Sequence, residues 1–173
     1  MAEKKYTPMM QHYLKMKEEN PESILFYRLG DFYEMFFEDA KLVSQELDLV
    51  LTGRSAGVEE KVPMCGIPFH AANSYIQRLV KKGYKVAICE QLEDPSSAKG
   101  LVDRGIIKII TPGTYMDATM DAKSTNYMAS CDVSSFEITV IYCELSTGEL
   151  KYQTLQRSLV ALQKALLEQN VSE

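Results

Sequence analysis

The sequence has 173 residues, of which 19 are basic and 24 are acidic, and its formal net charge is −5 at pH 7. Apolar residues make up 46% of the chain, enough to build a buried core, and this excludes a disordered tail. The nine Gly and six Pro residues exclude collagen-like and low-complexity chains. The negative balance argues against a protein that coats nucleic acid, because affinity for phosphates comes from Lys and Arg.

The charge is distributed unevenly along the chain. Residues 18–48 carry a net charge of −7, residues 1–17 and 54–108 each carry +3, and residues 109–173 carry −4. A site for a polyanion must therefore be local. The four Cys residues are widely spaced and no signal peptide is evident, which indicates a reducing compartment, the cytoplasm. No apolar run approaches the roughly 18 residues of a membrane helix, so no membrane partner is expected.

The first predicted helix follows Thr7, a residue suited to the N-cap position, and has Pro8 in its first turn. It is expected to end at Asn20. Residues 24–29 and 32–37 are rich in β-branched and aromatic residues, and a Gly-Asp pair separates them. This pattern predicts a β-hairpin.

A long helix over residues 31–47 is the alternative, because Asp31 could cap it and Glu34 could complete a capping box. From Phe36 onward the apolar residues do follow a helical stripe. We favour a hairpin followed by a helix over residues 38–47, because aromatic and β-forming residues stand on both sides of the Gly-Asp pair.

The following segments alternate between strand and helix patterns. Strands are predicted at 48–52, 62–67, 84–90 and 105–111, a helix at 71–82, and loops at 53–61 and around 94–97. Short strands interleaved with helices predict an α/β domain over residues 1–115, in which helices flank a mixed β-sheet.

Residues 116–124 lack periodicity and are predicted to form a linker. A second unit over residues 125–173 is predicted to contain strands at 127–133, 136–143 and 150–155 and a helix at 159–167. Three strands and one helix cannot bury both faces of a sheet, so we expect this domain to be truncated at residue 173.

The sequence carries little that resembles catalytic machinery. The sequence has no G-x-x-x-x-G-K-[ST], G-x-S-x-G or H-E-x-x-H motif. Cys65 and His70 lack partners at the spacing of a zinc site, so no metal site is predicted. Asp132 is similar to the first carboxylate of RNase H-like nucleases, which hold two metal ions between several carboxylates. A nuclease that uses Asp132 with carboxylates beyond residue 173, and residues 1–115 as an accessory domain, is the competing enzyme hypothesis.

The tip of the predicted hairpin carries an unusual pair of side chains. Phe32 and Glu34 are two residues apart, so in a strand they project from the same face, whereas on a helix they would diverge. An aromatic ring and a carboxylate would then emerge side by side.

The segment around this pair, Tyr-Arg-Leu-Gly-Asp-Phe-Tyr-Glu-Met-Phe at 27–36, closely resembles the Phe-x-Glu segment of the MutS family of bacterial DNA mismatch-repair proteins. The likeness continues through residues 7–10, 63–70, 86–91 and 111–114. It implies an amino-terminal mismatch-recognition domain over residues 1–115, followed by the start of an RNase H-like α/β connector domain.

The resemblance also implies how the chain would work. In the family, the Phe wedges into the minor groove and stacks on a mispaired or unpaired base, and the Glu hydrogen-bonds to that base; these positions are Phe32 and Glu34. Unstacking a base step costs less free energy at a mispair, so the protein would recognise the mispair by the ease with which the DNA deforms there. A carboxylate near phosphates is repelled, and the hypothesis is that Glu34 donates or shares a proton when bound.

Arg54, Met64 and Gly66 align with family segments near the DNA and are possible secondary contacts, although Arg54 fits a solvated loop position equally well. For the full-length protein the resemblance implies an ATPase that uses ATP and magnesium, a homodimer, mismatched double-stranded DNA and downstream repair proteins as partners, and a bacterial cytoplasmic, nucleoid-associated location. No cofactor and no ATP hydrolysis are expected for this chain. A paralogue that uses the domain only for protein contacts is a third hypothesis, against which the presence of both Phe32 and Glu34 argues.

Overall fold

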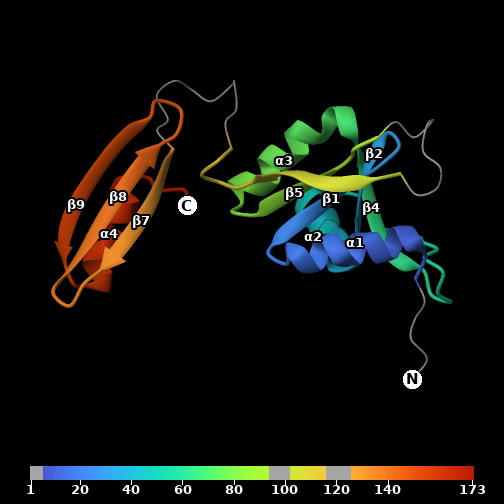
Figure 1. The fold of residues 1–173 in the computed structure, drawn as a ribbon, viewed down its shortest axis with the longest axis horizontal. Helices are drawn as coiled ribbons and strands as arrows, with labels where there is room; N and C mark the ends of the chain where they lie inside the picture. The colour runs from blue at the N-terminus through green and yellow to red at the C-terminus, as the bar shows by residue number, and fades with distance from the viewer. Residues whose placement is uncertain (1–5, 94–101, 116–125) are drawn as a thin grey trace. The chain divides into compact units, whose positions relative to one another are not determined.

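The computed structural model describes residues 6–93, 102–115 and 126–173, and its chain divides into two units, Met1–Ile110 and Thr111–Glu173. A six-stranded sheet forms the centre of the first unit and a three-stranded sheet that of the second (Figure 1). The α/β class, with a mixed sheet flanked by helices, is confirmed. The predicted loop at 94–97 and the linker at 116–124 lie outside the described residues, and the domain boundaries stay predictions.

The first unit alternates between strands and helices along the chain. Its elements are α1 (Pro8–Glu19), β1 (Ser23–Leu29), β2 (Phe32–Phe36), α2 (Phe37–Leu47), β3 (Thr52–Arg54), β4 (Val62–Pro68), a short 3-10 helix η1 (Phe69–Ala71), α3 (Ala72–Lys81), β5 (Lys85–Gln91) and β6 (Arg104–Ile110). The strand order is β3-β4-β2-β1-β5-β6. Only β1 and β5 are parallel neighbours, and the other pairs are antiparallel.

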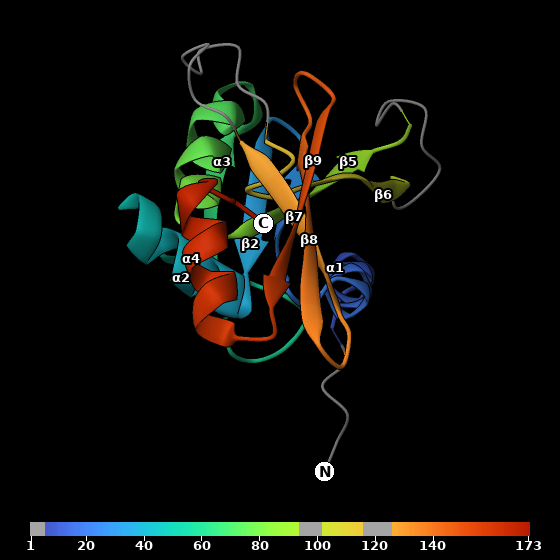
Figure 2. The ribbon, with the colours of Figure 1, turned by 90° about the vertical axis from the view of Figure 1, so that its left-hand side faces the viewer.

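Helices cover both faces of this sheet, with α1 on one side and α2 and α3 on the other (Figure 2). The hydroxyl of Thr7 accepts a hydrogen bond from the Met10 N–H at 3.4 Å, so the predicted N-cap of α1 is confirmed. Buried Met10 and Tyr13 of α1 pack into one core cluster with Tyr27 and Phe36 of the sheet. On the opposite face, the Cys65 thiol lies 3.5 Å from the carbonyl oxygen of Ala40 in α2.

Strands β1 and β2 form the predicted antiparallel hairpin, and the alternative of a single helix over residues 31–47 is wrong. Leu29 pairs with Phe32, so only Gly30 and Asp31 remain in the turn. Gly30 has a φ of 58°, a left-handed conformation that glycine adopts without steric cost. The Phe69 N–H donates to the Asp31 carbonyl oxygen at 3.0 Å and ties the turn to the start of η1.

The strand predicted at 48–52 is wrong in position. Asp48 ends α2 in a left-handed conformation with a φ of 56°, and the Leu49 N–H donates back to the Ser44 carbonyl oxygen at 2.9 Å. This helix cap redirects the chain, so residues 49–51 make no sheet pairs and Val50 is 78% exposed. The strand begins only at Thr52 and includes Arg54, which was predicted to lie in a loop.

The second unit contains β7 (Tyr127–Val133), β8 (Glu137–Glu144), β9 (Glu149–Gln156) and α4 (Leu159–Glu168), as its strand and helix patterns predicted. The strands form an antiparallel sheet in chain order. Side chains of α4 pack on one face of it, against Tyr127, Ile138, Val140 and Tyr142. The RNase H-like connector assignment and the truncation stay predictions. Within the described ranges, no helix is long and apolar enough to cross a membrane.

Candidate functional site

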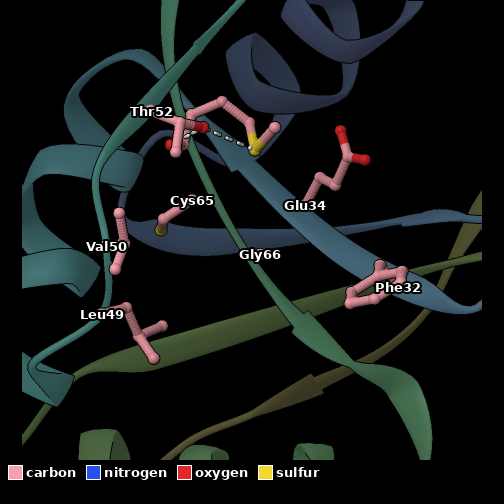
Figure 3. Close-up of a pocket in the computed structure, with 8 residues that line it drawn as sticks. Phe32, Glu34, Leu49, Val50, Thr52, Cys65 and Gly66 are labelled. Carbon is pink, nitrogen blue, oxygen red and sulfur yellow. Dashed lines mark hydrogen bonds between the residues drawn. The ribbon is translucent and has the colours of Figure 1, made fainter.

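Phe32 and Glu34 project from the same face of β2, next to the hairpin turn (Figure 3). They lie opposite Pro68 and Gly66 of β4. The ring of Phe32 is 47% exposed although it is one of the largest apolar side chains of the unit, whereas the intervening Tyr33 is buried. The sheet therefore holds an aromatic ring and a carboxylate side by side, as the two-residue spacing predicted.

The guanidinium of Arg54 forms an ion pair with the Glu34 carboxylate. Arg54 belongs to β3 and Glu34 to β2, and β4 lies between these strands, so the pair spans the width of three strands. The Glu34 side chain is 14% exposed and that of Arg54 is 37% exposed. From the sequence, Arg54 was either a secondary DNA contact or a solvated loop residue. Nothing in the sequence marked it as the partner of Glu34, because the two residues are 20 positions apart.

Met64 and Gly66 lie on β4 between the two charged residues. The Thr52 hydroxyl donates to the Met64 carbonyl oxygen at 3.2 Å and fixes the edge of the sheet there. A Cβ atom added at Gly66 would lie 3.5 Å from the Glu34 Cγ. The missing side chain therefore leaves the surface beside Glu34 open, which is a common role for glycine in a strand that a ligand approaches.

A pocket of about 480 Å³ opens next to Phe32 and Glu34. Its lining residues are Phe32, Glu34, Leu49, Val50, Thr52, Met64, Cys65 and Gly66. Three of these, Leu49, Val50 and Thr52, come from the segment predicted as a strand, and were missed as site residues because their sequence is typical of a buried strand. The helix cap at Asp48 is what turns this apolar segment toward the pocket.

A second cluster supports the tip of the hairpin on the opposite face of the sheet. The Arg28 guanidinium carbon lies 3.6 Å from the centroid of the Phe69 ring, and its Nη1 lies 3.3 Å from a carboxylate oxygen of Glu90. The Tyr33 hydroxyl donates to the same carboxylate oxygen, and burial, together with this neighbouring carboxylate, raises the pKa of Tyr33 to about 12. These contacts connect the hairpin to η1 and to β5, and they limit its bending.

The other residues considered from the sequence do not join this cluster of functional groups. Cys65 is buried, and burial raises the pKa of its thiol to about 12, so it is an inert neutral group. His70 lies in η1 and Asp132 is exposed on β7, opposite Thr139. Among the residues that the structure describes, no group of three or more His, Cys, Asp and Glu side chains could hold a metal ion.

Comparison with known proteins gives the family. The family model described as MutS domain I matches residues 7–119. The DNA mismatch repair protein MutS of Clostridium botulinum (strain Loch Maree / Type A3) is 53% identical over 96% of this chain and 19% of its own length. The protein of the same name from Clostridium tetani (strain Massachusetts / E88) is 58% identical over 84% of this chain and 17% of its own length.

The chain thus spans about a fifth of the length of the relatives that it matches. Most of the family model falls on the first unit, which holds the hairpin, the exposed Phe32 and the Glu34–Arg54 pair. By the extent of the model match and by the identity to these relatives, the chain belongs to the MutS family and carries its domain I.

Proposed function

We propose that this chain recognises mispaired or unpaired bases in double-stranded DNA, as the mismatch-reading part of a DNA mismatch-repair protein. Phe32 wedges into the minor groove and stacks on the mispaired base, and Glu34 hydrogen-bonds to that base. The observation that best supports this is the half-exposed ring of Phe32 next to Glu34, at the end of a hairpin in a MutS domain I.

The wedge suits the energetics of base unstacking. An apolar ring inserted between base steps separates them at a cost of a few kcal/mol per step, and this cost is lowest where pairing is already weak. The inserted side chain must therefore be held rigidly in place. Phe32 stands on a strand paired with neighbours on both sides, so the sheet resists its displacement.

Removal of the wedge tests the proposal. In the full-length protein, Phe32→Ala should abolish the preference for a duplex with one mispair over a fully paired duplex, because the small side chain cannot hold a base step apart. Binding to labelled duplexes at one stated salt concentration measures this preference. Phe136→Ala is a control, since Phe136 is an exposed aromatic residue of the second unit and lies outside the pocket. A Phe32→Ala protein that still prefers the mispair would contradict the proposal.

The remaining expectations concern the longer protein. We propose an ATP-dependent repair protein that forms a homodimer, uses magnesium, acts with downstream repair proteins and works in the bacterial cytoplasm near the nucleoid. The sequence has no P-loop motif, the usual element that binds nucleotide phosphates. ATP and magnesium would be bound by other parts of the longer protein.

A further inference from the structure

The Glu34–Arg54 ion pair includes one of the two proposed recognition residues, and the proposed function does not use Arg54. The carboxylate is largely buried at 14% exposure, whereas the arginine side chain remains 37% exposed. One side of the guanidinium therefore faces the carboxylate while another part of the side chain is open to solvent. Arg54 can meet an approaching ligand without any rearrangement of the sheet.

The chemistry of a guanidinium allows its partner to be replaced. Arginine carries five N–H donors in a fixed fork that fits a carboxylate and a phosphate equally well. Because the Arg54 side chain is partly exposed, water competes for its charge, and the pair contributes less net stabilisation than its short contact suggests. A DNA phosphate can therefore take the place of the Glu34 carboxylate at little cost, provided that the carboxylate gains another partner.

We propose that Arg54 is a specificity-determining residue, which exchanges the Glu34 carboxylate for a backbone phosphate only when Phe32 has entered a mispaired step. This inference rests on the proposed function of Phe32 and Glu34. On paired DNA the ion pair stays closed, and at a mispair it opens.

The condition follows from the charges. On paired DNA no base is available to form a hydrogen bond with Glu34, and an unpartnered carboxylate would be repelled by the nearby phosphates. Arg54 therefore keeps Glu34 neutralised while the protein samples paired DNA. At a mispair the exposed base supplies the hydrogen bond that Glu34 loses, and Arg54 is released to a phosphate. Glu34 and Arg54 each replace their mutual contact with a contact to DNA, Glu34 to the base and Arg54 to a phosphate. The ion pair therefore opens only where a mispair is present.

The salt dependence of binding measures this exchange, because each phosphate contact contributes about 0.9 to the slope of log affinity against log salt. In the full-length protein, Arg54→Met should lower the slope by about 0.9 on mispaired DNA and leave it unchanged on paired DNA. Glu34→Gln releases Arg54 permanently, so it should raise the slope on paired DNA by about 0.9. The double variant should lose this increase. Arg54→Lys retains the charge and should restore the slope on mispaired DNA.

Lys41→Met is the matched control, because Lys41 pairs with Glu38 on α2, on the opposite face of the sheet, and its loss changes the net charge equally. Both slopes should remain as in the unmodified protein. Two results would overturn the inference: an Arg54→Met slope that is unchanged on mispaired DNA, or one that falls equally on both duplexes, which indicates a plain phosphate contact. These are distinct from failure of the proposed function, which Phe32→Ala reports. The thermal unfolding midpoint of each variant checks that it is folded.

Discussion

In the proposed complex with DNA, the Glu34 carboxylate would lie near phosphates of the same charge. In the structure Arg54 neutralises this charge, and Gly66 leaves the space beside it open. A carboxylate accepts hydrogen bonds but donates one only when it holds a proton. If Glu34 bonds to an acceptor atom of a base, a proton must therefore lie between them.

Two substitutions at Glu34 separate the loss of the charge from the loss of the hydrogen bond. In the full-length protein, Glu34→Ala should weaken binding to a mispaired duplex by about tenfold, the value of one hydrogen bond of about 1.4 kcal/mol. Glu34→Gln keeps a donor of similar size and should retain most of this affinity. Binding of each variant to the mispaired duplex is measured from pH 6 to pH 9. Equal losses of affinity for the two variants over that range would rule out the shared proton. Glu38→Gln, at an exposed glutamate on α2, is the control.

Individual contacts such as these were only partly predictable. The placement of Phe32 and Glu34 on one face followed from local spacing, because side chains alternate along a strand. The Glu34–Arg54 pair could not be predicted in this way, because it depends on the order of the strands in the sheet, in which β4 lies between β2 and β3. That strand order is set by packing of the whole sheet and leaves no trace in the spacing of the two residues.

At the scale of elements, the hairpin could be predicted from the sequence, but the position of β3 could not. The Gly-Asp turn and its flanking aromatic residues agree in sequence and in structure, so local and global preferences coincide. The segment after α2 has the composition of a buried strand, but the left-handed cap at Asp48 leaves residues 49–51 outside the sheet. Residues other than glycine seldom adopt a left-handed backbone conformation, so the sequence did not indicate a helix cap at Asp48.

The hairpin also depends on the cluster behind its tip. Arg28 lies against the Phe69 ring and pairs with Glu90, so it connects three elements that are distant in the sequence. A cation held over an aromatic ring contributes about 0.5–1 kcal/mol at exposed sites and more when it is desolvated. Rigidity of this cluster should be transmitted to Phe32, which follows Arg28 by only four residues.

We expect Arg28→Met to loosen the hairpin without unfolding the unit. Amide hydrogen exchange at residues 28–33 should become about tenfold faster, which corresponds to about 1.4 kcal/mol of local stability. The preference of the full-length protein for a mispaired duplex should fall in parallel, because a wedge that yields cannot unstack a base step. Arg78→Met, at an exposed arginine of α3, is the control. Unchanged exchange at the hairpin would refute a supporting role for the cluster.

The whole molecule is poor in the charge that DNA binding requires. Residues 1–110 carry a net charge of −1 and residues 111–173 carry −4, although the first unit holds the proposed recognition surface. Recognition at a single base pair needs a wedge and a hydrogen bond, but affinity needs many phosphate contacts. The chain spans only about a fifth of its relatives, so we infer that most phosphate contacts come from the longer protein.

If most phosphate contacts come from the longer protein, the isolated chain should bind DNA weakly. At physiological salt the 173-residue chain should bind duplex DNA with a Kd of about 10⁻⁴ M or weaker, at the weak limit of non-specific binding, whether or not the duplex contains a mispair. The full-length protein should bind the mispaired duplex far more tightly, and its affinity should fall steeply with added salt because many counterions are released. Fluorescence anisotropy with the same labelled duplexes measures both. Tight and selective binding by the chain alone would show that its few basic residues suffice, and that the rest of the longer protein is not needed to hold the DNA.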